Sequence, residues 1–195
     1  MRKVVINGID FNSIISFYRT HGSVDQKYYT VEEVEKNNIE SIFSDRIFHI
    51  VKNNGTFYFI KEYLTDKDIA TEEFKIAREF IDNPVTMNVY AYDDGKVLCE
   101  YISGVSLTEI KCIPSYPDNL ICIIDKTVEF LKDLIETEKI HLFEVSANNV
   151  LVDVVSSSIR VIDLESNPLR YEEFKKKNLL MYNALIKQKD IIGGV

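Results

Sequence analysis

The chain has 195 residues, of which 46% are hydrophobic, enough for one buried core or for two small lobes. Its formal net charge is −8 without any basic block, which argues against nucleic acid and anionic membrane surfaces as main partners. No apolar run reaches the roughly 18 residues of a membrane span, and the first residues lack a signal-peptide core, so we expect a cytoplasmic location, with delivery into a host cell left open.

The cysteines, Cys99, Cys112 and Cys122, are scattered and form no C-x-x-C pair. This spacing predicts neither a zinc site nor a disulfide framework, and it favours a reducing compartment. The histidines are also too widely spaced for a metal site built on imidazole ligands.

The first 29 residues carry weak signals and are interpreted as an extension of unknown role. Residues 4–6 are typical of a short strand, and residues 14–18 are interpreted as a short helix. Thr30 begins the sequence TVEEVEKN, in which a threonine N-cap precedes acidic residues, so a helix is expected to start there.

Three antiparallel strands rich in β-branched and aromatic residues are predicted next, at residues 39–43, 47–51 and 56–63. The sequence Asn53-Asn54-Gly55 between the last two is typical of a hairpin turn. Lys61 lies in the third strand, FYFIKEY, whose other residues are mostly aromatic or apolar. A single lysine in such a strand is usually an edge or solvent-facing residue.

Residues 68–80 form a predicted helix, whose apolar positions repeat at helical spacing: Ile69, Ile76, Ala77 and Phe80. Glu73 falls on this apolar face, where an unpaired carboxylate would be unfavourable. Lys61 is therefore its expected partner. Glu72, one residue further round the helix, is the alternative.

A second hairpin is predicted from strands at residues 85–92 and 96–101, around the turn Asp93-Asp94-Gly95. The segment LCEYISGVSL follows. Two helices are expected after it, at residues 119–138 and 171–187. The apolar stripe of the second one is assigned to Phe174, Leu179, Tyr182 and Leu185 or Ile186.

Between these helices, the sequence predicts two strands, at residues 150–154 and 159–162, joined by a polar turn. A hairpin of these strands would place Asn149 and Asp163 side by side at one end. An amide oxygen and a carboxylate at such a position suit Mg²⁺ with phosphates as further ligands. Two ordinary polar turn residues are the alternative interpretation.

The order of these features resembles the protein-kinase-like fold, in which the pattern H-R-D-L-x-x-x-N is followed by D-F-G. Here the corresponding segments are LFEVSANN, ending at Asn149, and the triplet Asp163-Leu164-Glu165. The segment EYISG and the ending VIDLES are similar to small bacterial kinases, namely lipopolysaccharide-core heptose kinases and short effector kinases.

The resemblance implies an ATP- and Mg²⁺-dependent phosphotransferase and assigns a role to each site residue. Lys61 would hold the ATP phosphates and Glu73 would hold Lys61, while Glu144 would accept the proton of the acceptor hydroxyl. The metal ligands would be Asn149 and Asp163. The hinge residues would be Cys99 as gatekeeper, with the backbone of Glu100 and Ile102 against the adenine edge.

The implied fold is α+β and two-lobed: a five-stranded antiparallel N-lobe sheet with one helix, and a truncated, mostly helical C-lobe. As one kinase-like domain over residues 1–195, it would have its N-lobe at about 30–101, its hinge at about 100–105 and its C-lobe at 106–195. The sequence departs from the kinase pattern at two points. No glycine-rich phosphate loop lies between the first two predicted strands, and Glu144 stands where the family has aspartate.

Three functions follow from these observations. The first is a kinase acting on a hydroxyl of a sugar, another small molecule or a protein, for which the short C-lobe favours a small acceptor. The second is a pseudokinase, a binding or scaffold module without phosphate transfer. The third is an ordinary α+β domain that is unrelated to kinases and has a similar order of features by chance. The sequence does not indicate the oligomeric state.

Overall fold

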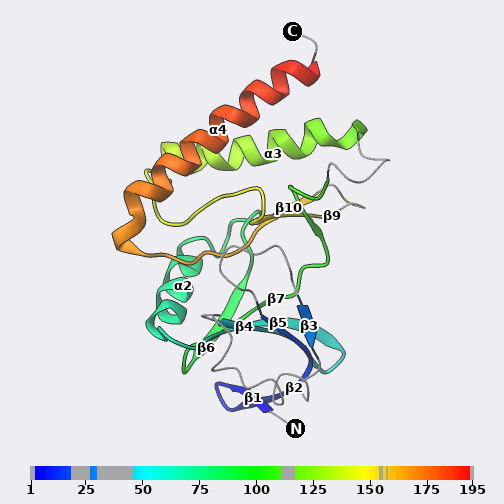
Figure 1. Cartoon of the computed structure of the whole chain (residues 1–195), viewed down its shortest axis with the longest axis vertical. Coiled ribbons are helices and arrows are strands. Elements are labelled where there is room, and N and C mark those ends of the chain that lie inside the picture. Colours follow the sequence, from blue (N-terminus) through cyan, green and yellow to red (C-terminus); the bar gives the residue numbers. More distant parts are fainter. Residues whose placement is uncertain are drawn as a thin grey trace. The chain divides into compact units, whose positions relative to one another are not determined.

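The computed structural model describes residues 3–18, 27–29, 46–110, 117–153, 156 and 158–193. Within them the chain is a mixed α+β protein with antiparallel sheets (Figure 1). Its contacts divide it into two compact units. Unit 1 comprises Met1–Glu79 and Asn88–Tyr101, and unit 2 comprises Phe80–Met87 and Ile102–Val195.

Unit 1 is built on a seven-stranded sheet in the order β1-β2-β4-β5-β7-β6, with β3 paired to β2. All of its strand pairs are antiparallel. The strands are β1 (Lys3–Ile6), β2 (Ile9–Tyr18), β3 (Lys27–Tyr29), β4 (Arg46–Asn53), β5 (Thr56–Tyr63), β6 (Val89–Asp93) and β7 (Lys96–Glu100).

Three hairpin turns in this sheet place both central residues at positive φ, which type I′ turns require. The pairs Asn54–Gly55 and Asp94–Gly95 confirm the two predicted turns, with φ of 49° and 84° and of 43° and 77°. Asn7–Gly8, at 50° and 76°, makes a third that joins β1 to β2. Local turn chemistry therefore fixes three of the strand pairings.

The helix predicted over residues 14–18 is wrong, because this segment is the second half of β2. The sequence IDFNSIISFY is rich in β-branched and aromatic residues, and it pairs with both β1 and β4. Residues 3–18 and 27–29 thus belong to the sheet rather than to an extension outside it, so the sheet has seven strands instead of five. The predicted strand at 39–43 and the helix start at Thr30 lie outside the described residues.

The two faces of β5 have different surroundings. Helix α2 (Asp68–Glu79) packs against β5, β6 and β7 and buries Glu73, which confirms the predicted helix and its buried acid. Because side chains alternate along a strand, Lys61 and Tyr63 share one face of β5, and Ile60 lies on the other. Ile60 belongs to a core cluster with Val4, Ile6, Phe11, Val51 and Leu98.

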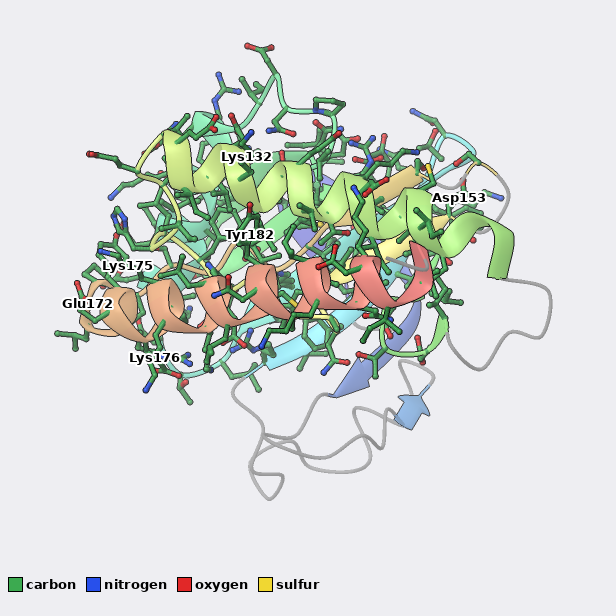
Figure 2. The ribbon with its side chains drawn as sticks, turned by 90° about the horizontal axis from the view of Figure 1, so that it is seen from above. Lys132, Asp153, Glu172, Lys175, Lys176 and Tyr182 are labelled. Carbon is green, nitrogen blue, oxygen red and sulfur yellow. The ribbon has the colours of Figure 1, made fainter. Side chains whose placement is uncertain are left out.

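Unit 2 combines two long helices, a 3-10 turn and a small sheet of order β10-β9-β8. Helices α3 and α4 lie side by side (Figures 1 and 2). The elements are β8 (Val105–Ser106), α3 (Pro117–Glu136), β9 (Val150–Asp153), β10 (Ser158–Val161), η3 (Pro168–Arg170) and α4 (Tyr171–Gly193). Neither helix, nor α2, has the length and apolarity needed to cross a membrane, as judged over the described part of the chain.

Two predictions in this region need correction. The strand expected at 85–92 is divided: Thr86 forms a parallel bridge with Val161 in unit 2, and β6 begins only at Val89. On α4 the buried residues are Phe174, Asn178 and Leu185, whereas Leu179 is exposed. The helix therefore buries a polar residue, Asn178, at a position where apolar spacing suggested a leucine.

Candidate functional site

The predicted pair of Lys61 and Glu73 is formed in unit 1. Lys61 Nζ donates to Glu73 Oε1 at 2.5 Å, and the two side chains are 3% and 0% exposed. Glu72, the alternative partner, instead accepts from Lys75 Nζ on the exposed side of α2. Strand β5 supplies the lysine and α2 the acid, so the pair ties the helix to the sheet.

The second carboxylate oxygen of Glu73 also has a partner. Tyr63 Oη donates to Glu73 Oε2 at 2.8 Å, within the same buried environment. No sequence motif pointed to Tyr63. The period-two spacing from Lys61 was the available signal, because it places both residues on one face of β5.

The predicted hinge residues occupy the end of β7 and the segment after it. Cys99 is fully buried, between Phe59 of β5 and Val89 of β6. The backbone N–H of Glu100 donates to the carbonyl of Asn88 at 2.9 Å, and its carboxylate accepts from Asn88 Nδ2 at 2.8 Å. Ile102 is half-buried and belongs to unit 2, whereas Cys99 and Glu100 belong to unit 1.

The hairpin of β9 and β10 is formed in unit 2 and puts Asn149 and Asp163 at the same end. Val150 pairs with Val161, and Ile162 N–H donates to the carbonyl of Asn149 at 2.8 Å. Asp163 follows directly and has a φ of 63°. A left-handed conformation in a residue other than glycine is uncommon, and such residues concentrate at functional sites.

Two oxygen-bearing side chains, those of Asn149 and Asp163, lie at this end of the hairpin, and they are of the types that a hard cation binds. Asn149 is buried, and its amide nitrogen donates to the carbonyl of Glu144 at 3.2 Å, which leaves the amide oxygen as the atom that would face a metal ion. With the carboxylate of Asp163, it gives the oxygen ligands that Mg²⁺ prefers. Across the described residues, no group of three or more His, Cys, Asp and Glu side chains is placed to hold a metal.

Glu144 lies in the loop before this hairpin, between the buried residues Phe143 and Val145. Its side chain is 27% exposed and is held by cations of unit 2. Lys177 Nζ donates to Glu144 Oε2 at 2.8 Å, and Arg170 Nη2 lies 3.8 Å from the same oxygen. The predicted proton acceptor is therefore part of an ion-pair network.

Glu173 completes that network from the first turn of α4. Arg170 donates to its carboxylate from Nε and Nη2 at 3.0 Å each, and Lys177 Nζ lies 2.8 Å from Oε1. These two cations lower the pKa of Glu173 to about 2. The pKa of Lys177 is raised, first by its hydrogen bond with Glu144 and then by that with Glu173. Lys175 and Lys176, also on α4, are exposed (Figure 2).

Asn178 is a site residue that the sequence reasoning missed. It is fully buried, and its side chain bonds to the loop on both sides of Glu144. The amide nitrogen donates to the carbonyls of Ile140 and Phe143 at 2.7 and 2.8 Å, and the amide oxygen accepts from Val145 N–H at 2.8 Å. Its position four residues after Phe174, on the buried stripe of α4, was the signal present in the sequence.

Comparisons with known proteins do not assign the chain to a family. No protein-family model matches the chain. A DNA polymerase III PolC-type from Pediococcus pentosaceus is 30% identical over 102 residues, which is 51% of this chain. The match spans only 7% of the length of that polymerase.

Proposed function

We propose that the chain is an ATP- and Mg²⁺-dependent phosphotransferase with a protein-kinase-like fold. Unit 1 would be its N-lobe, unit 2 its truncated C-lobe, and the segment around Glu100–Ile102 its hinge. The acceptor would be a hydroxyl group of a sugar or other small molecule, with a protein as the other possible class.

The buried ion pair between Lys61 and Glu73 is the observation that carries the proposal. Both groups lose nearly all hydration, and a buried pair often stabilises a fold no better than apolar residues of the same size. A functional requirement is a better explanation of such a pair than stability. In the kinase-like fold this pair presents the lysine to the ATP phosphates.

The arrangement of elements in unit 1 adds support. Leaving β1 and β3 aside, the chain runs through β2, β4, β5, α2, β6 and β7, which is three strands, a helix and two strands. Lys61 lies on the third of these strands and Glu73 on the helix. Kinases place their lysine and glutamate on the corresponding strand and helix.

In unit 2, Asn149 and Asp163 would hold Mg²⁺, which neutralises charge on the transferred phosphoryl group when bound. Glu144 would accept the proton from the acceptor hydroxyl. Asn178 would keep the loop of Glu144 in place through the main chain, and Lys177 would hold the Glu144 carboxylate in position by pairing with it.

A pseudokinase is the second candidate function, and the ion pairs around Glu144 favour it. Its carboxylate already pairs with Lys177 and Arg170, so an acceptor hydroxyl would have to share it with them. In addition, the connection between the paired strands β2 and β4 contains a single glycine, Gly22. Gly22 itself lies outside the described residues.

A thermal-shift titration with ATP, in the presence and absence of Mg²⁺, tests the proposal. We compare the wild type with Asp163→Asn, because asparagine tolerates the left-handed conformation but removes the charge. The matched control is Asp153→Asn, at the opposite end of the same hairpin (Figure 2).

Binding to the native state raises the melting temperature by mass action. The proposal predicts a rise that requires Mg²⁺, is lost in Asp163→Asn and persists in Asp153→Asn. Nucleotide binding without any Mg²⁺ dependence would favour the pseudokinase. No shift for the wild type under any condition would refute the phosphotransferase and would leave a scaffold that binds no nucleotide, or an unrelated fold.

A further inference from the structure

Glu73 is bound through both of its carboxylate oxygens. Lys61 Nζ donates to Oε1 at 2.5 Å, and Tyr63 Oη donates to Oε2 at 2.8 Å. The carboxylate is completely buried, and the tyrosine is 2% exposed. A carboxylate with a single partner could rotate and still keep that contact, whereas one with a partner on each oxygen is fixed in its plane.

Tyr63 is itself anchored by groups of unit 1. The Arg46 guanidinium lies over its ring, 5.1 Å from the centroid, and the two residues are direct partners in the register of β4 and β5. The backbone N–H of Tyr63 donates to the carbonyl of Gly95 at 2.8 Å. The backbone hydrogen bond holds the main chain of Tyr63, and the ring cannot shift without disturbing the cation–π contact and the bond to Glu73.

We propose that Tyr63 is a positioning residue for phosphate binding, which acts through Glu73 on Lys61. The hydroxyl sets the orientation of the carboxylate, and the carboxylate sets the position of the ammonium group. A lysine held in this way reaches a phosphate without first losing the freedom of its flexible side chain, which favours binding. This inference rests on the proposed nucleotide-binding function of Lys61.

The test is the substitution Tyr63→Phe, which removes one oxygen atom and keeps the ring over which Arg46 lies. Tyr58→Phe is the matched control, since Tyr58 lies on the opposite face of the same strand, with its ring against Phe11 and Tyr90. Both variants are compared with the wild type for the dissociation constant of Mg²⁺–ATP by calorimetry, and for melting temperature without nucleotide.

Tyr63→Phe is expected to weaken Mg²⁺–ATP binding about tenfold, which corresponds to the lower end of the contribution of one hydrogen bond to a charged group, and Tyr58→Phe to leave it unchanged. The same substitution is then made in Glu73→Gln, which retains Lys61 but removes the charge that fixes it. There Tyr63→Phe should weaken binding less than twofold, since the route through Glu73 is already interrupted.

The outcomes separate the two proposals. A wild type that does not bind Mg²⁺–ATP refutes the proposed function and this inference together. A wild type that binds, with Tyr63→Phe of equal affinity, refutes the role of Tyr63 alone. An equal loss of affinity in the wild-type and Glu73→Gln backgrounds also refutes it, because Tyr63 would then act independently of Glu73.

Discussion

Asn178 on α4 accepts a hydrogen bond from the backbone N–H of Val145 at 2.8 Å. The same side chain donates to Phe143 and Ile140, so one buried amide satisfies three backbone groups of the loop that contains Glu144. Its neighbour Lys177 holds the carboxylate of Glu144 at 2.8 Å. Helix α4 thus fixes Glu144 through both its main chain and its side chain.

Asn178→Ala should destabilise the protein strongly, because it leaves two carbonyls and one N–H without partners in a buried region. We expect a loss of about 3–5 kcal/mol in the free energy of unfolding, measured with urea. Asn183→Ala, at an exposed position of the same helix, is the control and should change stability by less than about 0.5 kcal/mol. Similar losses in the two variants would show that Asn178 does not hold the loop.

Lys61→Met should lower the free energy of unfolding by about 3–5 kcal/mol, because it leaves the buried carboxylate of Glu73 without its cation. Lys75→Met removes the cation of an exposed pair, Lys75 with Glu72 on α2, and should have no measurable effect. Urea unfolding of both variants provides the comparison. If Lys61→Met proved as stable as Lys75→Met, the carboxylate of Glu73 would not depend on Lys61 for its stability in the folded protein.

Substitutions at Asp163 separate backbone strain from charge. Asp163→Ala and Asp163→Asn remove the same carboxylate, but alanine is disfavoured at a φ of 63° and asparagine is tolerated. Asp163→Ala should therefore be less stable than Asp163→Asn by about 1 kcal/mol. Thermal or urea unfolding measures this difference, and equal stability would argue against a left-handed conformation at Asp163.

The ion-pair network around Glu144 predicts how the stability of the folded protein depends on pH. The pKa of Glu173 is lowered from 4.5 to about 2 by hydrogen bonds from Arg170 and Lys177. A lowered pKa in the folded state means that Glu173 contributes stability above its ordinary pKa and loses this contribution as pH falls towards about 2.

The measurement is the difference in melting temperature between the wild type and Glu173→Gln as the solution is acidified from neutral pH. We expect a constant advantage of the wild type from pH 7 to 5, and its progressive loss below the ordinary glutamate pKa of 4.5. A difference independent of pH down to the acid limit would mean that the pairing is absent in solution.

Gly104, in the EYISG segment, is required for packing rather than for an unusual φ. A Cβ at this position would lie 2.8 Å from the carbonyl oxygen of Val152 in β9. Gly104→Ala should therefore destabilise the protein by about 1–3 kcal/mol, since backbone atoms must move to relieve the overlap. Ser103→Ala, one residue earlier and exposed, is expected to be neutral in the same urea unfolding experiment.

Features determined by local chemistry were predictable from the sequence. The turns at Asn54–Gly55 and Asp94–Gly95 follow from residues that tolerate positive φ, and α2 follows from apolar spacing. The pairing of Lys61 with Glu73 followed because a buried acid needs a partner. The Asn7–Gly8 turn carried the same signal, and it would have predicted β2, paired with the expected strand at residues 4–6, in place of a helix.

Features that depend on distant segments were not predictable. The role of Asn178 depends on backbone groups 33 to 38 residues earlier in the chain, so its polar character on an apolar stripe gives no indication of what it binds. The bond of Tyr63 to Glu73 and the placement of Lys177 against Glu144 depend likewise on how helices pack. Sequence patterns specify the elements, but these contacts arise only when the elements meet.

Because the Glu144 loop is attached to α4, the helix affects amide hydrogen exchange in the loop and the behaviour of a chain shortened before α4. The Val145 amide can exchange with solvent only when its bond to Asn178 opens, so its hydrogen exchange should follow the opening of α4. A fragment that ends before α4 would retain β9 and β10 but lose the anchor of this loop. We therefore expect α4 to open together with the loop that contains Glu144.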